Sequence, residues 1–259
     1  MPHKHIGDEF LMCCVDTLSV LREEHMLKIV NFTRKYGEKT AVDNISLHIR
    51  KGEIYGFIGH NGAGKTTTLK ACCGISQIQE GNIYIDGISV KDNVLECKKR
   101  MAYLPDNPDI YTFMTGIQYL NFIADVYGMS TEERTANIAQ YAELFGIKDN
   151  LGQPVSSYSH GMKQKLAIIS AWMHSPKLIL MDEPFVGLDP IAALNLKNMM
   201  KEHCENGGAI FFSTHVLDVV EKLCDKVAII KSGKLLATGT MEEVKGNSSL
   251  EDVFFELEA

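Results

Sequence analysis

The chain has 259 residues, of which 45% are hydrophobic and 23% charged, as is ordinary for a globular protein with a sizeable core. This composition excludes a chain that is disordered, collagen-like or coiled-coil throughout. The 26 Lys and Arg against 33 Asp and Glu give a net charge of −7, so bulk positive charge does not attract the chain to nucleic acid. We expect no nucleic-acid partner.

Strand patterns dominate the first part of the chain. Ile45, Leu47 and Ile49 alternate with polar residues, which is the period of two of a half-buried strand. Apolar composition and bounding turns predict three further strands, at 27–36, 53–58 and 82–86. Apolar residues spaced by three and four then predict two helices, one at 117–127 and one from 131 to the glycine at 146.

Continuous apolar runs mark the second half of the chain, at 178–181, 209–212 and 227–230. Such runs are typical of strands that are buried on both faces of a largely parallel sheet. A Ser-Gly turn at 232–233 leads from the last run to an apolar stretch at 235–237, and residues 249–255 have the pattern of a short amphipathic helix. The predicted elements thus give the chain an antiparallel β start, an α/β body and a helical middle.

The apolar runs and the cysteines indicate in which part of the cell the chain works. No run approaches the roughly 18–20 residues of a membrane-spanning helix. Asp8, Glu9 and Asp16 interrupt the apolar residues near the start, which argues against a secretory signal. An odd number of cysteines without a CxxC pair favours reduced thiols over a disulfide framework or a zinc site. The seven are Cys13, Cys14, Cys72, Cys73, Cys97, Cys204 and Cys224.

Residues 59–66 read Gly-His-Asn-Gly-Ala-Gly-Lys-Thr and match the phosphate-loop pattern G-x-x-x-x-G-K-[ST] in full. They follow a strand pattern and precede a helical stretch at 67–73, which is the context that the motif requires. Glycines let the backbone wrap phosphates with its N–H groups, and the helix N-terminus adds positive charge. Lys65 is expected at the β- and γ-phosphates and the Thr66 hydroxyl on Mg²⁺. The residues predicted to bind the nucleotide here are Gly59, Asn61, Gly62, Ala63, Gly64, Lys65, Thr66 and Thr67.

Two carboxylates, Asp182 and Glu183, follow the buried run at 178–181. In open α/β sheets ligands bind beyond the carboxyl ends of the strands, so this pair and the phosphate loop are expected at one edge. Asp182 is then suited to Mg²⁺, and Glu183 to the general base that orients water against the γ-phosphate. Asp-Glu-Pro alone is common in surface turns, and it is the phosphate loop that favours the functional interpretation.

Five further segments accompany these two motifs, in a fixed order: Tyr36, Leu104-Pro105-Asp106, Ser159-His160-Gly161-Met162-Lys163-Gln164, Gly187-Leu188-Asp189-Pro190 and His215. They resemble the A-loop, Q-loop, signature loop, D-loop and switch histidine of ATP-binding cassette (ABC) ATPases. The resemblance runs from about residue 26 to 239. It implies an α/β P-loop NTPase fold with a mixed, largely parallel central sheet, an antiparallel β subdomain and an inserted helical subdomain.

The resemblance also implies domain limits. Residues 1–25 are an N-terminal extension or leader, 26–247 the ABC ATPase domain and 248–259 a C-terminal helix. Within the domain, the core covers 26–105 and 170–247, and the helical subdomain covers 106–169.

Roles follow from the family for the remaining residues. Tyr36 stacks on adenine, Asp106 lies near the nucleotide and Mg²⁺, and His215 joins Glu183 and Lys65 in catalysis. Ser159 and Gly161 contact ATP held by a second subunit. The resemblance thus implies an ATP-hydrolysing subunit that dimerises head-to-tail around two Mg-ATP and drives an integral membrane permease.

The chain departs from the family pattern at two positions. His160 stands where the first glycine of the signature is usual, which would strain a left-handed backbone but not a helix start. Asp106 stands where glutamine is usual. Both variants resemble an exporter-like bacterial branch, so we expect a cytoplasmic protein at the inner face of the cell membrane that drives export.

Two other functions stay open at this point. One is a soluble, single-cassette ABC ATPase with a role in assembly. The other is a non-hydrolysing nucleotide-binding regulator, suggested by Asp106 and His160 but opposed by the intact catalytic residues. A further choice concerns the apolar residues beside Asp106, which either dock the permease or cap the helical segment's own core: Ile110, Tyr111, Phe113 and Met114.

Overall fold

The computed structural model describes residues 25–108 and 110–258. The first strands of the chain form a four-stranded sheet. Its order is β2-β1-β4-β5 and all its neighbours are antiparallel. The predicted extension at 1–25, apart from His25, lies outside the described residues. The strands are β1 (His25–Tyr36), β2 (Lys39–Arg50), β4 (Glu80–Ile85) and β5 (Ile88–Ser89). The antiparallel start predicted from the sequence is confirmed.

A six-stranded sheet forms the centre of the molecule, in the order β10-β9-β3-β8-β7-β6. All neighbours are parallel except β9 and β10. The strands are β3 (Ile54–Ile58), β6 (Met101–Leu104), β7 (Leu178–Asp182), β8 (Ala209–Thr214), β9 (Lys226–Lys231) and β10 (Lys234–Thr240). Every residue of β3, β7 and β8 is buried, as the continuous apolar runs predict.

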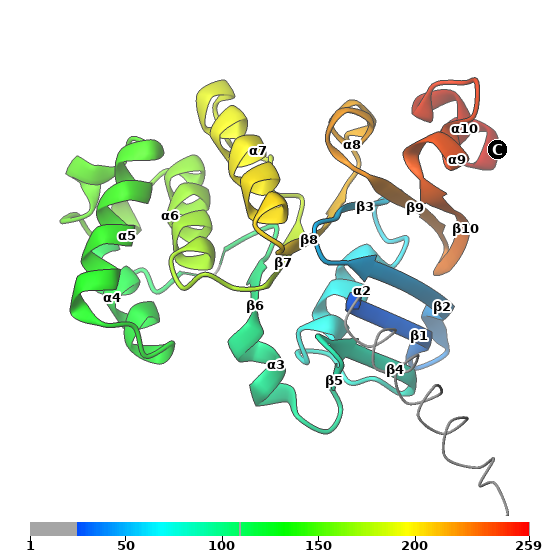
Figure 1. The fold of residues 1–259 in the computed structure, drawn as a ribbon, viewed down its shortest axis with the longest axis horizontal. Coiled ribbons are helices and arrows are strands. Elements are labelled where there is room, and N and C mark those ends of the chain that lie inside the picture. The colour runs from blue at the N-terminus through cyan, green and yellow to red at the C-terminus, as the bar shows by residue number, and fades with distance from the viewer. Residues whose placement is uncertain (1–24, 109, 259) are drawn as a thin grey trace, which may run out of the picture.

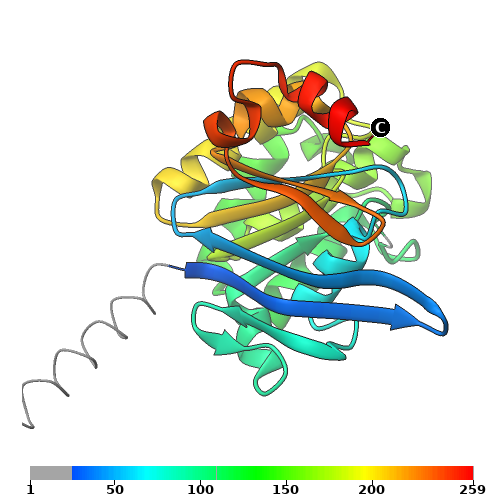
Figure 2. The same ribbon diagram turned by 90° about the vertical axis from the view of Figure 1, so that its right-hand side faces the viewer.

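Alternating side chains of the central strands build two cores, one on each face. Tyr55 and Phe57 pack with the antiparallel sheet and α2 (Lys65–Cys72), whereas Ile54 and Ile58 pack with helices on the other face. Figures 1 and 2 show these layers on either side of the central sheet. The helices of the second face include α7 (Pro190–Glu205), α8 (Leu217–Leu223), α9 (Met241–Lys245) and α10 (Leu250–Glu258). Both faces of the central sheet are therefore covered, and a ligand can bind only at the ends of its strands.

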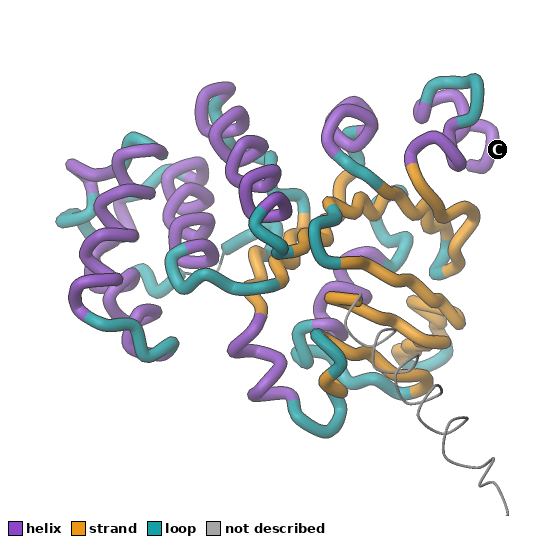
Figure 3. The backbone as a smooth tube through the Cα atoms, viewed as in Figure 1, coloured by secondary structure: helices purple, strands orange, loops and turns teal. Residues whose placement is uncertain are grey.

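A lobe of helices stands between β6 and β7 in the chain and extends away from the sheets (Figures 1 and 3). It holds α4 (Gly116–Val126), α5 (Thr131–Leu144) and α6 (His160–Trp172), with short 3₁₀ turns at Lys148–Asn150 and Val155–Ser157. Thr115 with Gln118, and Ser130 with Glu133, form capping boxes at the starts of α4 and α5. Both predicted helices are confirmed, and the exact limits of the subdomain stay predictions.

Two observations concern membranes and thiols. No helix within residues 25–108 and 110–258 combines the length and apolarity needed to cross a bilayer. The described cysteines are all buried and form no disulfide, and Cys13 and Cys14 lie outside the described residues. Burial raises the pKa of the Cys72 thiol far above its usual range, so this thiol stays protonated.

Asp86 joins three parts of the fold through its carboxylate, which is only 16% exposed. It lies 2.9 Å from Arg100 Nη1 of α3 (Val94–Arg100), 2.9 Å from Lys177 Nζ and 3.7 Å from Lys51 Nζ. Burial alone raises the pKa of Asp86, but the hydrogen bond from Lys177 and the three positive charges outweigh it and lower the pKa. The ionised carboxylate is therefore stabilised by folding.

We expect Asp86→Asn to lower the free energy of unfolding by about 1–2 kcal/mol at pH 7. Because the pKa of Asp86 is depressed in the folded state, this contribution is complete above the ordinary pKa near 4 and is lost as the pH falls through the lower folded value. Urea unfolding of both proteins between pH 7 and pH 3 measures the difference. Asp92→Asn, at an exposed position, is the control. A penalty that does not shrink with falling pH would contradict the prediction.

Candidate active site

A cavity of about 280 Å³ opens at the carboxyl ends of β3 and β7. It brings together the phosphate loop, the end of β1, Asp106 and the acidic pair, as the strand-end argument predicts. Its lining residues are Tyr36, Lys39, Ala41, His60, Asn61, Gly62, Gly64, Lys65, Thr66, Thr67, Asp106, Asp182 and Glu183. Among the predicted site residues, Gly59, Ala63, Ser159, Gly161 and His215 are not in this lining.

The phosphate loop joins β3 to α2 in a path that needs glycine. Gly62 and Gly64 have φ of +82° and +116°, where other residues are strained. A Cβ on Gly59 would lie 2.2 Å from the Ile230 carbonyl oxygen, and one on Gly64 would lie 2.7 Å from that of Ala41. The loop is thus packed so closely that its shape is fixed by the strands around it.

Lys65 is the first residue of α2 and is only 6% exposed. Its Nζ donates to the carbonyl oxygens of Gly59, at 2.5 Å, and His60, at 3.3 Å, and lies 3.8 Å from Glu183 Oε1. Burial lowers the pKa of Lys65, and the charges of Glu183 and Asp182 oppose this. The ammonium group therefore lies inside the loop, where phosphate oxygens would be stronger partners than the two carbonyls.

Asp182 ends β7 and is 2% exposed. The Thr66 hydroxyl donates to its Oδ2 at 2.5 Å, and the Ser213 hydroxyl donates to its Oδ1. Ser213 is a site residue that the sequence argument missed. Its signal was a polar residue at the end of the apolar run at 209–212, in the strand that pairs with β7 opposite Asp182.

The oxygens of Thr66 and Asp182 fit Mg²⁺, which prefers hard oxygen ligands. Within the described residues no three His, Cys, Asp or Glu side chains gather as a metal site. This does not conflict with the fit, because Mg²⁺ in nucleotide sites takes one or two carboxylates and completes its shell with phosphates and water. Asp106 is exposed on the rim of the same cavity.

Glu183 occupies a left-handed backbone conformation with φ of +48°, which is uncommon for a residue other than glycine. Its Oε1 lies 3.0 Å from His215 Nδ1 and 3.8 Å from Lys65 Nζ. Its Oε2 accepts a hydrogen bond from the His215 backbone N–H at 3.4 Å. Oε1 is buried and accepts no hydrogen bond of good geometry from the described residues. The carboxylate is thus held beside the phosphate loop with one oxygen available as a base.

Tyr36 stands 49% exposed at the end of β1, on the rim of the cavity. The Arg34 guanidinium lies over its ring, 4.6 Å from the centroid, and its hydroxyl is 3.4 Å from Ser76 Oγ. Hydrogen bonds with Ser76 and Arg34 lower the pKa of Tyr36. A base that stacks on Tyr36 must use the face opposite Arg34.

The signature segment lies outside the cavity. Ser159 is exposed and caps α6, because its Oγ accepts from the Met162 N–H at 3.3 Å. His160 is the first helical residue and is not among the residues with positive φ. Of the two backbones considered for this position, the structure has the helix start, so histidine causes no backbone strain here.

The start of α6 is tied to the chain that follows Glu183. A Cβ on Gly161 would lie 2.6 Å from the Gly187 carbonyl oxygen. Gln164 Nε2 donates to the Pro184 carbonyl oxygen at 3.2 Å, and Lys165 Nζ lies 2.6 Å from Asp189 Oδ2. The segment after Glu183 is therefore in direct contact with the signature helix.

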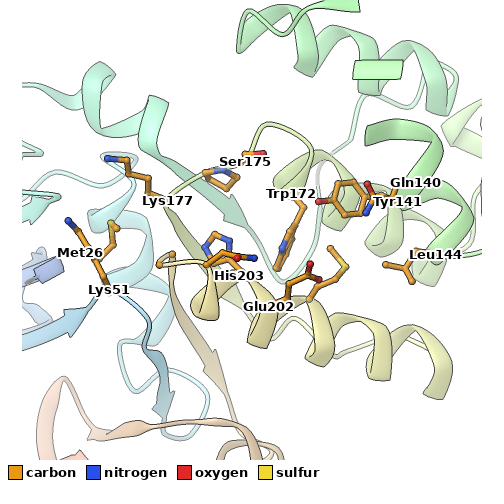
Figure 4. Close-up of a pocket in the computed structure, with 15 residues that line it drawn as sticks. Met26, Lys51, Gln140, Tyr141, Leu144, Trp172, Ser175, Lys177, Glu202 and His203 are labelled. Carbon is orange, nitrogen blue, oxygen red and sulfur yellow. The ribbon is translucent and has the colours of Figure 1, made fainter. Parts of the chain in front are cut away.

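A larger cavity, of about 500 Å³, lies at the opposite, amino ends of β7 and β8. Figure 4 shows Lys51 and Lys177 at one end of it, Tyr141 and Leu144 at the other, and Trp172 between them. It includes no residue of the phosphate loop or the acidic pair. The smaller cavity is therefore the candidate active site, because the titratable groups and the anion-binding loop meet there.

The model of the ABC transporter family matches residues 42–186, which is more than half of the chain. The chain belongs to the ABC transporter family. It is the ATP-binding subunit of such a transporter and hydrolyses ATP for transport. The family resemblance read from the motifs is confirmed.

Relatives of this ABC ATPase include two proteins that are named for antibiotic resistance or transport. The linearmycin resistance ATP-binding protein LnrL of Bacillus subtilis is 33% identical over 85% of this chain and 70% of its own length. The bacitracin transport ATP-binding protein BcrA of Enterococcus faecalis is 34% identical over 85% of this chain and 71% of its own. Both alignments extend well beyond the residues that the family model matches.

Solved structures confirm the fold. An ATP-binding subunit of an ABC transporter, 31% identical, superposes with a TM-score of 0.87 over 90% of this chain and 100% of its own. A dimeric bacterial ABC transporter cassette, 23% identical, has a TM-score of 0.77 over 83% of this chain and 99% of its own. The predicted α/β fold with a largely parallel sheet and an antiparallel β subdomain is thus confirmed.

Proposed function

We propose that this subunit hydrolyses ATP in the 280 Å³ cavity, as one half of a head-to-tail dimer that drives an export permease. The observation on which the proposal depends is the placement of Glu183, which lies 3.8 Å from Lys65 Nζ and 3.0 Å from His215 Nδ1 at the end of β7. A base, a phosphate-binding cation and a polar group that contacts the γ-phosphate meet there at the mouth of an anion-binding loop.

Binding of ATP would use groups that already point into the loop. Lys65 Nζ exchanges the Gly59 and His60 carbonyls for oxygens of the β- and γ-phosphates, and loop N–H groups hold the same phosphates. Thr66 and Asp182, with Asp106 nearby, would hold Mg²⁺, which supplies positive charge to the β- and γ-phosphate oxygens when bound. Tyr36 stacks on the adenine. Asn61 and Thr67 line the phosphate side of the cavity.

Hydrolysis needs a water aligned with the γ-phosphate. Glu183 Oε1 faces the loop and accepts the proton as this water attacks. His215 holds the Glu183 carboxylate through its backbone N–H, and its half-exposed ring, 3.0 Å from Oε1, would reach the γ-phosphate. The non-hydrolysing nucleotide-binding regulator considered from the sequence is therefore not favoured, since Lys65, Asp182, Glu183 and His215 are all present.

A second subunit would complete the site. Ser159 and Gly161 lie outside the cavity of their own chain, although their hydroxyl and N–H groups suit a phosphate. Beside the segment at 187–189, Val186 and Ile191 are 40% and 73% exposed, which is apolar surface suited to an interface. In the head-to-tail arrangement, Ser159 of each subunit reaches the γ-phosphate bound to the other, and hydrolysis releases the contact.

The membrane partner would bind beside Asp106. Ile110 is buried and caps the helical lobe's own core, whereas Tyr111 and Phe113 are 48% and 80% exposed. Their ring centroids lie 5.6 Å apart, and Phe122 adds a third ring 5.8 Å from Tyr111. We assign this aromatic patch to the permease, which places the subunit at the cytoplasmic face of the membrane. Relatives named for bacitracin transport and linearmycin resistance support export.

We expect Ser159→Arg to reduce ATP hydrolysis by about 10²-fold or more while the ATP affinity of the single subunit stays unchanged. The reason is that Ser159 serves the other subunit's nucleotide. Phosphate release and isothermal titration with ATP measure the two quantities. Because Ser159 also caps α6, stability falls by about 1 kcal/mol, and circular dichroism verifies the fold. Thr135→Arg, on the exposed face of α5, is the control. Hydrolysis near the wild-type rate would overturn the assignment.

A further inference from the structure

The C-terminal helix α10 lies against the phosphate loop. Leu250 and Phe254, four residues apart and thus on one face of the helix, are 0% and 6% exposed. The ring centroid of Phe254 is 5.2 Å from that of His60, with the ring planes at 64°. This is the edge-to-face arrangement that aromatic rings prefer. A residue near the end of the chain thus touches the second residue of the loop that binds phosphate.

His60 connects Phe254 with Lys65, at the centre of the site. The His60 carbonyl oxygen accepts a hydrogen bond from Lys65 Nζ at 3.3 Å. His60 also lines the active-site cavity, and as a residue it is exposed on the loop surface. The Phe254 ring therefore packs against the side of an exposed loop residue.

The same helix is anchored to the segment that follows His215. Glu221 of α8 pairs with Lys245 and accepts from the Leu250 backbone N–H at 3.4 Å. Leu250 and Phe254 share a core cluster with Val220 of α8. Figures 1 and 2 show α8 and α10 on the same side of the central sheet. Since α8 begins two residues after His215, α10 contacts both the phosphate loop and the element next to the switch histidine.

We propose that Phe254 is a positioning residue for ATP binding: through the His60 ring, the C-terminal helix holds the phosphate loop in its binding conformation. The capping of α10 is consistent with a fixed support, since Ser249 Oγ accepts from the Asp252 N–H at 3.1 Å and donates to Asp252 Oδ2 at 2.7 Å. The inference rests on the proposed function in one respect, that ATP occupies the cavity lined by this loop.

The test compares Phe254→Leu, which keeps an apolar side chain but removes the ring, with Phe255→Leu, its exposed neighbour on the same helix. Titration with ATP is expected to give a dissociation constant raised about three- to ten-fold for Phe254→Leu, the effect of losing one aromatic pair. Phe255→Leu is expected to bind as the wild type does. Thermal unfolding of both variants records any loss of stability separately.

His60→Ala provides the readout that a merely structural role would not move. If Phe254 acts through His60, the double variant Phe254→Leu/His60→Ala binds ATP no more weakly than His60→Ala alone. Two results would overturn the inference: an unchanged dissociation constant in Phe254→Leu, or effects of the two substitutions that multiply. Lys65→Ala separates this failure from failure of the ATP site, because it must weaken ATP binding whatever Phe254 does.

Discussion

Replacing Glu183 with Gln is expected to leave ATP binding intact and to reduce turnover by about 10²–10⁴-fold, the usual effect of losing a general base. The amide keeps the shape of the side chain, and its oxygen can still accept from the His215 N–H. It cannot take the proton of the attacking water. In this variant Asp182 still lies near the buried Lys65, so the positive charge of Lys65 remains compensated. Lys65 therefore stays in the phosphate loop and can still bind phosphate.

The measurement is steady-state phosphate release together with the dissociation constant for ATP. Glu205→Gln, at the exposed end of α7, is the matched control and is expected to behave as the wild type. Phosphate release by Glu183→Gln within a few-fold of the wild-type rate would remove Glu183 from the role of base. Loss of ATP binding would instead show that the carboxylate mainly shapes the loop.

Replacing Lys65 with Ala is expected to weaken ATP binding by about 10- to 100-fold, since hydrogen bonds to charged groups contribute about 1.5–3 kcal/mol. The ammonium group lies inside the loop, where it donates to the Gly59 and His60 carbonyl oxygens. The substitution also leaves Asp182 and Glu183 as buried carboxylates without their cation, so we expect the melting temperature to fall as well.

Isothermal titration with ATP measures the loss of affinity. Lys70→Ala, exposed in the last turn of the same helix, controls for charge and helix propensity. Unchanged ATP affinity in Lys65→Ala, with Lys70→Ala also unchanged, would contradict the assignment of residues 59–66 as the phosphate site.

Some of the elements that sequence pattern alone predicted have the same environment along their whole length. The runs at 178–181 and 209–212 are apolar throughout because β7 and β8 are buried on both faces. The phosphate loop was recognisable because its path demands glycine at 62 and 64. In both cases the local sequence has a single physical explanation.

Other elements were not predicted, for two different reasons. Strand β6 is only four residues long and follows α3 without a turn, so no period is visible. Helix α7 had readable signals, namely an Asp189 cap, Pro190 in its first turn and buried Ala192 and Leu196, and these were passed over.

Parts of the site depend on contacts that a sequence does not contain. The Ser213 hydroxyl reaches Asp182 only because β7 and β8 are neighbours in this register. The Phe254–His60 contact joins residues almost 200 positions apart. Even the signature histidine was ambiguous until the structure placed it at the start of α6.

The central claim is that each ATP is hydrolysed between the phosphate loop of one subunit and Ser159 of the other. Mixing Lys65→Ala, at an ATP concentration too low to fill its weakened site, with Ser159→Arg tests it most directly. A head-to-tail heterodimer of the two contains one site with both defects and one site with none. Random mixing makes half of the dimers heterodimers, so we predict recovery of about a quarter of the wild-type rate of phosphate release. A mixture as inactive as its components would contradict the account.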